Sequence, residues 1–287
     1  MADYSEVEIS RANPACIVFL LDQSQSMADP FGGQGGGLKG EQVATIMNRL
    51  IYDLGVECAP DEQGIRDWYH IGVIGYGKTV GPALRGELPK KWDIDQQPLV
   101  PISVLEESAT VETREVEDVN EAGEPFKRKQ KFAKWIDTTC ENGTPMCAAI
   151  RFAQRVIEPW ANTHLRSYPP IVINITDGEV NDLEGEPQRH VKLAAELQQI
   201  ATVGPLLLFN LHLSSKPSNP IIFPDDAVQL PDHFAEELFA MSSVLPDDMR
   251  TKAEAQGYQV RPGSRGFVFN ANAIDVYKFL RAGTRLR

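Results

Sequence analysis

Five short runs of consecutive apolar residues constrain the fold of this chain more than any other feature of its sequence. They cover residues 15–21, 70–76, 171–176, 206–213 and 266–269. Runs without polar alternation are typical of strands that are buried on both faces, as in a parallel sheet with helices on either side. With 287 residues, of which 42% are hydrophobic, the chain is long enough to bury such a sheet.

Segments with the 3.6-residue period of amphipathic helices lie between these runs. Val43, Ile46, Met47 and Leu50 share one face of a helix expected over residues 38–54. The other expected helices cover residues 145–157, 188–200, 232–242, 246–256 and 272–281. This alternation predicts an α/β doubly wound fold, with a mostly parallel central sheet and helices on both faces.

Residues 80–140 interrupt the alternation and contain no good helix. Residues 108–119 and 125–136 are rich in Val, Thr and charged residues, a pattern that predicts an exposed β-hairpin. The glycine-rich loop 32–37 is a second break. Leu38 follows it instead of the Lys-Ser/Thr of a phosphate-binding loop, so we interpret it as a flexible connector. We therefore expect a single domain over residues 1–287, with its core at about 13–285 and an insertion at about 80–140.

The formal net charge of -12 argues against partners that carry negative charge over a large surface. Such a chain is repelled by nucleic acid and by anionic membranes unless it has a local basic patch. The candidate patch is Lys127, Arg128, Lys129, Lys131 and Lys134, which we interpret as the solvated face of the hairpin. We expect neither nucleic acid nor membrane as a partner.

The N-terminal residues and the cysteines favour a cytoplasmic location. Asp3, Glu6 and Glu8 stand where a signal peptide carries positive charge. No apolar run approaches the ~20 residues that span a bilayer. The four cysteines form no CxxC pair and have no histidine at zinc-site spacing, which fits a reducing compartment.

Oxygen-bearing side chains follow two of the predicted strands. Asp22, Ser24 and Ser26 come directly after the first strand and alternate, so one loop can direct all three side chains to one side. Asp177 ends the third strand, and Thr144 precedes a helix. In open parallel sheets ligands bind beyond the carboxyl ends of the strands, so these five residues are expected to meet there.

Two carboxylates and three hydroxyls form a set of hard oxygen ligands that suits Mg²⁺. This ion prefers octahedral oxygen coordination and keeps some of its waters, so a position remains for an outside ligand. Because hydroxyls are neutral, the bound ion would keep positive character. Mn²⁺ fits by the same ligand logic, and Ca²⁺ fits less well.

The pattern resembles the metal-ion-dependent adhesion site (MIDAS) of von Willebrand A-type (vWA) and integrin I-like domains. The DxSxS element of that family matches Asp22, Ser24 and Ser26, its threonine matches Thr144, and its last aspartate matches Asp177. The resemblance implies that the serines contact the metal directly, that the threonine does so in the ligand-bound state, and that the aspartates often act through water. It also implies that a partner protein supplies a carboxylate to the metal.

A narrower resemblance concerns stand-alone bacterial vWA proteins of tellurite-resistance-like (TerY-like) systems. Residues 242–246 and 265–271 are similar to that group. It implies a role in stress or conflict signalling beside a protein kinase and a protein phosphatase.

The sequence leaves three functions open. The first is a metal-dependent protein interaction module without catalytic activity, which we favour because no nucleophile and base pair is evident. The second is an accessory subunit of an AAA-type ATPase of the MoxR or chelatase kind, which would use the same metal site. The third is a Mg²⁺-dependent phosphohydrolase, disfavoured because Ser24 stands where such enzymes place a second acid.

Overall fold

The computed structural model places an eight-stranded sheet at the centre of the molecule. It describes residues 2–31, 37–62, 64–84, 87–89, 92–119, 125–215, 219–271, 275 and 278. The strands are β1 (Ala15–Asp22), β2 (Tyr69–Tyr76), β3 (Val80–Pro82), β4 (Val100–Pro101), β7 (Ile171–Thr176), β8 (Leu207–His212), β9 (Ile221–Ile222) and β10 (Phe267–Phe269). Their order is β3-β2-β1-β7-β8-β10-β9, and β4 also pairs with β2. The five central strands β2, β1, β7, β8 and β10 run parallel, whereas β3, β4 and β9 pair with them in the antiparallel direction.

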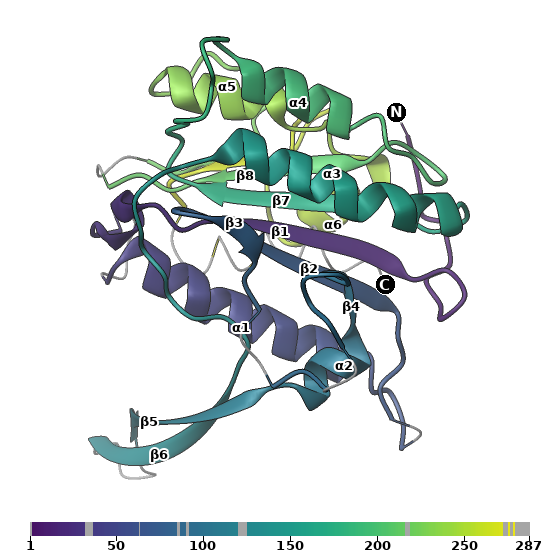
Figure 1. Cartoon of the computed structure of the whole chain (residues 1–287), viewed down its shortest axis with the longest axis vertical. Helices are drawn as coiled ribbons and strands as arrows, with labels where there is room; N and C mark the ends of the chain where they lie inside the picture. The colour runs from purple at the N-terminus through teal and green to yellow at the C-terminus, as the bar shows by residue number, and fades with distance from the viewer. Residues whose placement is uncertain are drawn as a thin grey trace.

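Helices cover both faces of the sheet, so the predicted doubly wound α/β fold is confirmed (Figure 1). One face packs against α1 (Lys39–Glu57), α2 (Ile102–Glu107) and α6 (Asp247–Ala255). The other packs against α3 (Met146–Thr163), α4 (Arg189–Leu197) and α5 (His233–Met241). Successive residues of β1 alternate between the two cores: Phe19 faces α1, whereas Val18 and Leu20 face α3. Burial on both sides explains why the strands appear in the sequence as unbroken apolar runs.

Two expectations about helices are wrong. Residues 80–140 do contain a helix, α2, whose Ile102 and Leu105 are buried against the core. Helix α3 continues six residues beyond Ile157, through Pro159 to Thr163. Pro159 removes one helical hydrogen bond, and the burial of Trp160 and Ala161 against the core offsets this cost.

Three predicted features lie wholly or partly outside the described residues. They are the glycine-rich loop at 32–37, of which only Gly37 is described, the hairpin turn at 120–124, and the last helix, of which only Asp275 and Lys278 are described.

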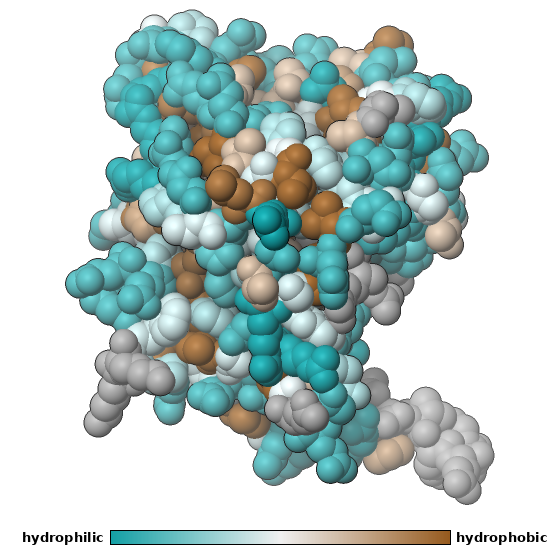
Figure 2. All heavy atoms as spheres, turned by 90° about the vertical axis from the view of Figure 1, so that its right-hand side faces the viewer, coloured by the Kyte–Doolittle hydropathy of each residue, from teal (hydrophilic) through white to brown (hydrophobic). Residues whose placement is uncertain are grey.

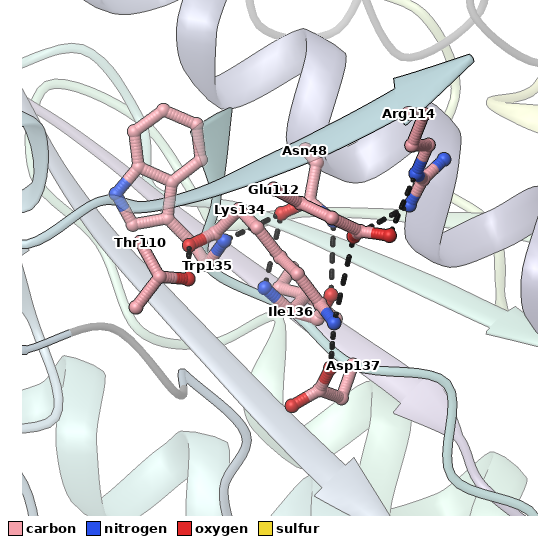
Figure 3. A network of polar contacts seen from close by, with 8 residues as sticks. All are labelled: Asn48, Thr110, Glu112, Arg114, Lys134, Trp135, Ile136 and Asp137. Carbon is pink, nitrogen blue, oxygen red and sulfur yellow. Dashed lines mark hydrogen bonds and ion pairs between the residues drawn. The ribbon is translucent and has the colours of Figure 1, made fainter. Parts of the chain in front are cut away.

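The predicted hairpin is confirmed as a separate two-stranded sheet, β5 (Thr110–Val119) with β6 (Pro125–Lys134). It extends away from the α/β body, at the lower left of Figure 1. Its base is fixed to α1 by Asn48, whose side-chain oxygen accepts from the backbone N–H groups of Trp135 (2.7 Å) and Ile136 (3.0 Å). The amide nitrogen of Asn48 donates to the Ile136 carbonyl at 2.9 Å, as Figure 3 shows.

The surface shows no broad apolar belt on the face drawn in Figure 2, where brown patches are scattered among hydrophilic side chains. Within the described ranges, no helix is both long enough and apolar enough to cross a membrane.

Candidate metal centre

The carboxyl ends of β1 and β7 lie side by side and bring two aspartates to one edge of the sheet. Leu21 is paired with Ile175 in the parallel register, so Asp22 and Thr176 end neighbouring strands. The Thr176 hydroxyl donates to Asp22 Oδ2 at 2.7 Å, although the two residues are 154 positions apart in the chain. Asp177 follows directly, and the electrostatic effect of its carboxylate reaches Asp22.

The loop after β1 folds back on the Asp22 carboxylate. The backbone N–H of Ser24 donates to Asp22 Oδ1 at 2.8 Å. The hydroxyls of Ser24 and Ser26 are hydrogen-bonded at 2.9 Å, with Ser26 inside the short 3-10 helix η1 (Gln25–Ala28). The structure therefore gathers Asp22, Ser24 and Ser26 within a few ångströms, as the alternating pattern predicts.

Thr144 lies in a loop that adjoins this edge. The Glu141 N–H donates to the Gln23 carbonyl at 2.6 Å, which places the start of the loop beside β1. The Thr144 carbonyl accepts from the N–H of Asn181 at 3.2 Å, which ties it to the loop after Asp177. Thr144 is buried, and these contacts place it between the two aspartate-bearing loops.

Asp177 has a partner that sequence reasoning missed. The Lys39 ammonium, at the first residue of α1, donates to Asp177 Oδ2 at 3.0 Å, and the two side chains are only 2% and 8% exposed. The other carboxylate oxygen, Oδ1, is buried and has no hydrogen-bond partner. The backbone carbonyl of Asp177 accepts from His212 Nε2 at 2.9 Å.

The electrostatics of this edge favour a further positive charge. Burial, and then the nearby Asp177 carboxylate, raise the pKa of Asp22 to about 6. Among the described contacts, one ammonium group, that of Lys39, balances the negative charge of these two buried carboxylates. Buried charge without compensation is costly, so a cation near Asp22 and Asp177 would stabilise the site.

The donors fit a hard divalent cation. Asp177 Oδ1 is an orphan oxygen in a buried position, and Ser24, Ser26 and Thr144 add neutral oxygens at the same edge. Asp22 is already held by Ser24 and Thr176 through both of its oxygens. Coordination of a metal by the five predicted residues stays a prediction, but their placement agrees with it.

Sequence reasoning also missed Thr176 and His212. Thr176 is the last residue of an apolar run, and its hydroxyl accepts from the N–H of Gly178 at 3.0 Å while donating to Asp22. Gly178 has φ +98, and a Cβ there would lie 2.9 Å from Cβ of Phe234 and 3.0 Å from His212 Nε2. The one sequence signal for the contact between Thr176 and Asp22 is a threonine at a strand end, directly before Asp-Gly. Without the strand order, such a threonine cannot be distinguished from one that packs in the core.

Comparisons with known proteins give a distant likeness. No protein-family model matches the chain, and no curated protein matches it. Among solved structures, proximal thread matrix protein 1 from the mussel byssus, with a zinc-occupied MIDAS motif, matches at a TM-score of 0.41 and 14% identity. The match covers 96% of this chain and 48% of that one, so the chain spans about half the length of the protein it matches. A likeness this distant carries no inference about the site, which rests on the geometry described above.

Proposed function

We propose that this chain is a vWA-type protein interaction module that binds a divalent cation, Mg²⁺ in the first instance, through Asp22, Ser24, Ser26, Thr144 and Asp177. The observation that carries the proposal is the buried pair Asp22 and Asp177, for which the described residues supply one compensating lysine and leave one carboxylate oxygen without a hydrogen-bond partner. The negative charge of these buried carboxylates favours binding of a cation at the site.

The oxygen donors define what a bound ion can do. Because Ser24, Ser26 and Thr144 are neutral, the ion retains positive character and can attract an external carboxylate. A partner protein with an exposed Asp or Glu is therefore the proposed ligand. The metal supplies the attraction, while Thr176 and the Ser24 N–H hold Asp22 in position.

We propose binding and not catalysis as the activity. Aspartyl-phosphate chemistry needs a second acid two residues after the nucleophile, and that position is Ser24, whose hydroxyl is hydrogen-bonded to that of Ser26.

The accessory role beside an AAA-type ATPase would use the same metal site, so a co-purifying ATPase would distinguish that role from the proposed one. The TerY-like signalling role is a finer proposal. Its motif residues Ser242 and Ser243 are buried and bond to Asn210 and to the Leu208 N–H, a packing role that says nothing about partners.

The proposal is tested by calorimetric titration of Mg²⁺ and Mn²⁺ into the metal-free protein. Wild type should bind one ion, and Ser26→Ala should weaken binding about tenfold, or ~1.4 kcal/mol. Asp177→Asn should abolish binding, whereas Asp95→Asn, an exposed aspartate, should leave it unchanged. Circular dichroism shows whether each variant is folded. Equal ion affinity in wild type, Ser26→Ala and folded Asp177→Asn would exclude this metal site.

A further inference from the structure

A groove of about 340 Å³ lies along the first turns of α3. The groove is lined by Arg151, Phe152 and Arg155 of α3, by Asp182 and Glu184 of the segment before α4, and by Arg189, the first residue of α4. Arg151 and Arg155 of α3 belong neither to the candidate metal site nor to the buried core.

The groove begins next to the candidate metal centre. Asp182 accepts from the N–H groups of Cys147 (3.1 Å) and Ala148 (2.8 Å), so its carboxylate caps the start of α3. The neighbouring Asn181 donates its N–H to the Thr144 carbonyl. Thr144 and the lining residue Cys147 are therefore separated by less than one helical turn, and a ligand at the metal would lie near the mouth of the groove.

The acidic groups of the groove are already engaged, whereas two of its basic groups are not. Arg189 pairs with Glu184 at 2.6 Å and donates to the Asp182 carbonyl at 3.1 Å. Arg151 and Arg155 are exposed and form no ion pair with any described residue; the Arg155 guanidinium lies 5.3 Å from the ring centre of Phe152. Asp182 is satisfied by the helix N–H groups. The groove thus offers two guanidinium groups that form no ion pair with a described residue.

The spacing of Arg151 and Arg155 disfavours a purely structural role. Like charges at i and i+4 of a helix destabilise it by a few tenths of a kcal/mol. The described acid that interacts electrostatically with Arg151 is Glu184, and its carboxylate is already paired with Arg189. Arginine binds carboxylates in a bidentate geometry, so the pair is suited to an acidic ligand.

We propose that this groove binds a second acidic residue of the same partner segment whose first carboxylate reaches the metal. The inference rests on the proposed function and adds the partner's chemistry. At 1.5 Å per residue, Arg151 and Arg155 lie roughly 7 to 14 Å along α3 from its start. An extended peptide rises about 3.3 Å per residue, so the second acidic residue follows or precedes the first by roughly two to four positions.

A basic groove also offsets, at short range, the repulsion between this acidic chain and an acidic partner. Charges separated by more than about 8 Å are largely screened at physiological salt, so the local guanidinium groups dominate once the partner is near. The partner is thus an extended protein segment with two spaced acidic residues.

The test is selection from a random ten-residue peptide library displayed on phage, bound in Mg²⁺ and eluted with EDTA. Wild type should enrich peptides with two acidic positions separated by two to four residues. The Arg151→Gln/Arg155→Gln double variant should enrich only one acidic position. Arg166→Gln, an exposed arginine beyond the end of α3, is the matched control and should select as wild type does. Synthetic peptides from the selection should bind the double variant about tenfold more weakly.

Each failure has its own signature. If wild type and the double variant enrich the same two acidic positions, the groove proposal is wrong. It is also wrong if both proteins enrich only one acidic position. In either case the proposed metal site is unaffected. Absence of EDTA-eluted peptides from folded wild type would overturn the proposed function and the groove with it. Since the substitutions remove a repulsion on an exposed face, circular dichroism should show unchanged folding.

Discussion

At the scale of single residues, Lys39 is the most informative side chain. It lies at the first position of α1, where the helix dipole disfavours positive charge, and it is 2% exposed. Its compensation is the contact with Asp177 at 3.0 Å. Lys39 therefore balances part of the buried negative charge in the metal-free protein and opposes a cation that approaches the same carboxylates.

Lys39→Met is expected to make folding more dependent on metal. Removal of one partner of a buried ion pair costs roughly 3 kcal/mol of unfolding free energy in EDTA, because Asp177 is left without compensation. Loss of the positive charge should also tighten Mg²⁺ binding. Urea unfolding in EDTA and in Mg²⁺, together with calorimetric titration, measures both effects.

Lys192→Met, on α4, serves as the control for a lost lysine charge. It should leave the difference between the EDTA and Mg²⁺ curves as it is in wild type. A Lys39→Met protein whose stability responds to Mg²⁺ no more than wild type does would contradict this account of Lys39.

At the scale of elements, the hairpin is held to the body at its base. Asn48 makes three hydrogen bonds to the backbone of Trp135 and Ile136, and the Trp135 indole N–H donates to the Leu105 carbonyl at 2.6 Å. In Figure 3 this anchor lies beside Lys134, which pairs with Asp137 and, at 3.8 Å, with Glu112. The exposed ion pairs contribute little, so the Asn48 amide is the main polar anchor.

Asn48→Ala is expected to loosen this anchor without unfolding the sheet. Two backbone N–H groups and one carbonyl lose their partner, which costs about 1–3 kcal/mol. Limited proteolysis should cut near residues 108–137 faster than in wild type, and urea unfolding gives the cost. Thr45→Ala, at an exposed position one turn earlier on α1, is the control. Equal cleavage of wild type and Asn48→Ala would show that the apolar contacts of the base suffice.

At the scale of the whole molecule, stability depends on pH through His70 on β2, next to α3. The Trp160 indole N–H donates to His70 Nδ1 at 2.8 Å, so the imidazole must be neutral at that nitrogen. Burial, and then the nearby His164, lower the pKa of His70 from 6.5 to about 4, and Asp67 opposes both effects. Below the ordinary value the unfolded chain takes up a proton that the folded chain refuses, so stability falls as the pH decreases.

Wild type should therefore lose roughly 2 kcal/mol of unfolding free energy through His70 between pH 7.5 and pH 5. His70→Asn removes this contribution, so the difference in stability between the two proteins should shrink, or reverse, as the pH falls. Urea unfolding at several pH values measures it. His233→Asn, at an exposed histidine, should follow wild type, and parallel curves for wild type and His70→Asn would contradict the assignment.

The sequence by itself determined most of the elements. Burial on both faces leaves continuous apolar runs, and burial on one face leaves a 3.6-residue period, so the core strands and helices α1, α3, α4, α5 and α6 were predicted from spacing. The short helix α2 was missed. It also determined the local part of the site. Asp22, Ser24 and Ser26 lie within five residues, and their contacts need only one loop.

The tertiary structure decided the contacts between distant parts of the chain. Lys39 meets Asp177 across 138 positions and Thr176 meets Asp22 across 154, because β1 and β7 are neighbours in the sheet. The pairing of α3 with the segment around Asp182, which forms the arginine groove, has the same origin. Periodicity records whether a residue is buried but not which other residue it is buried against, and that depends on the order of the strands.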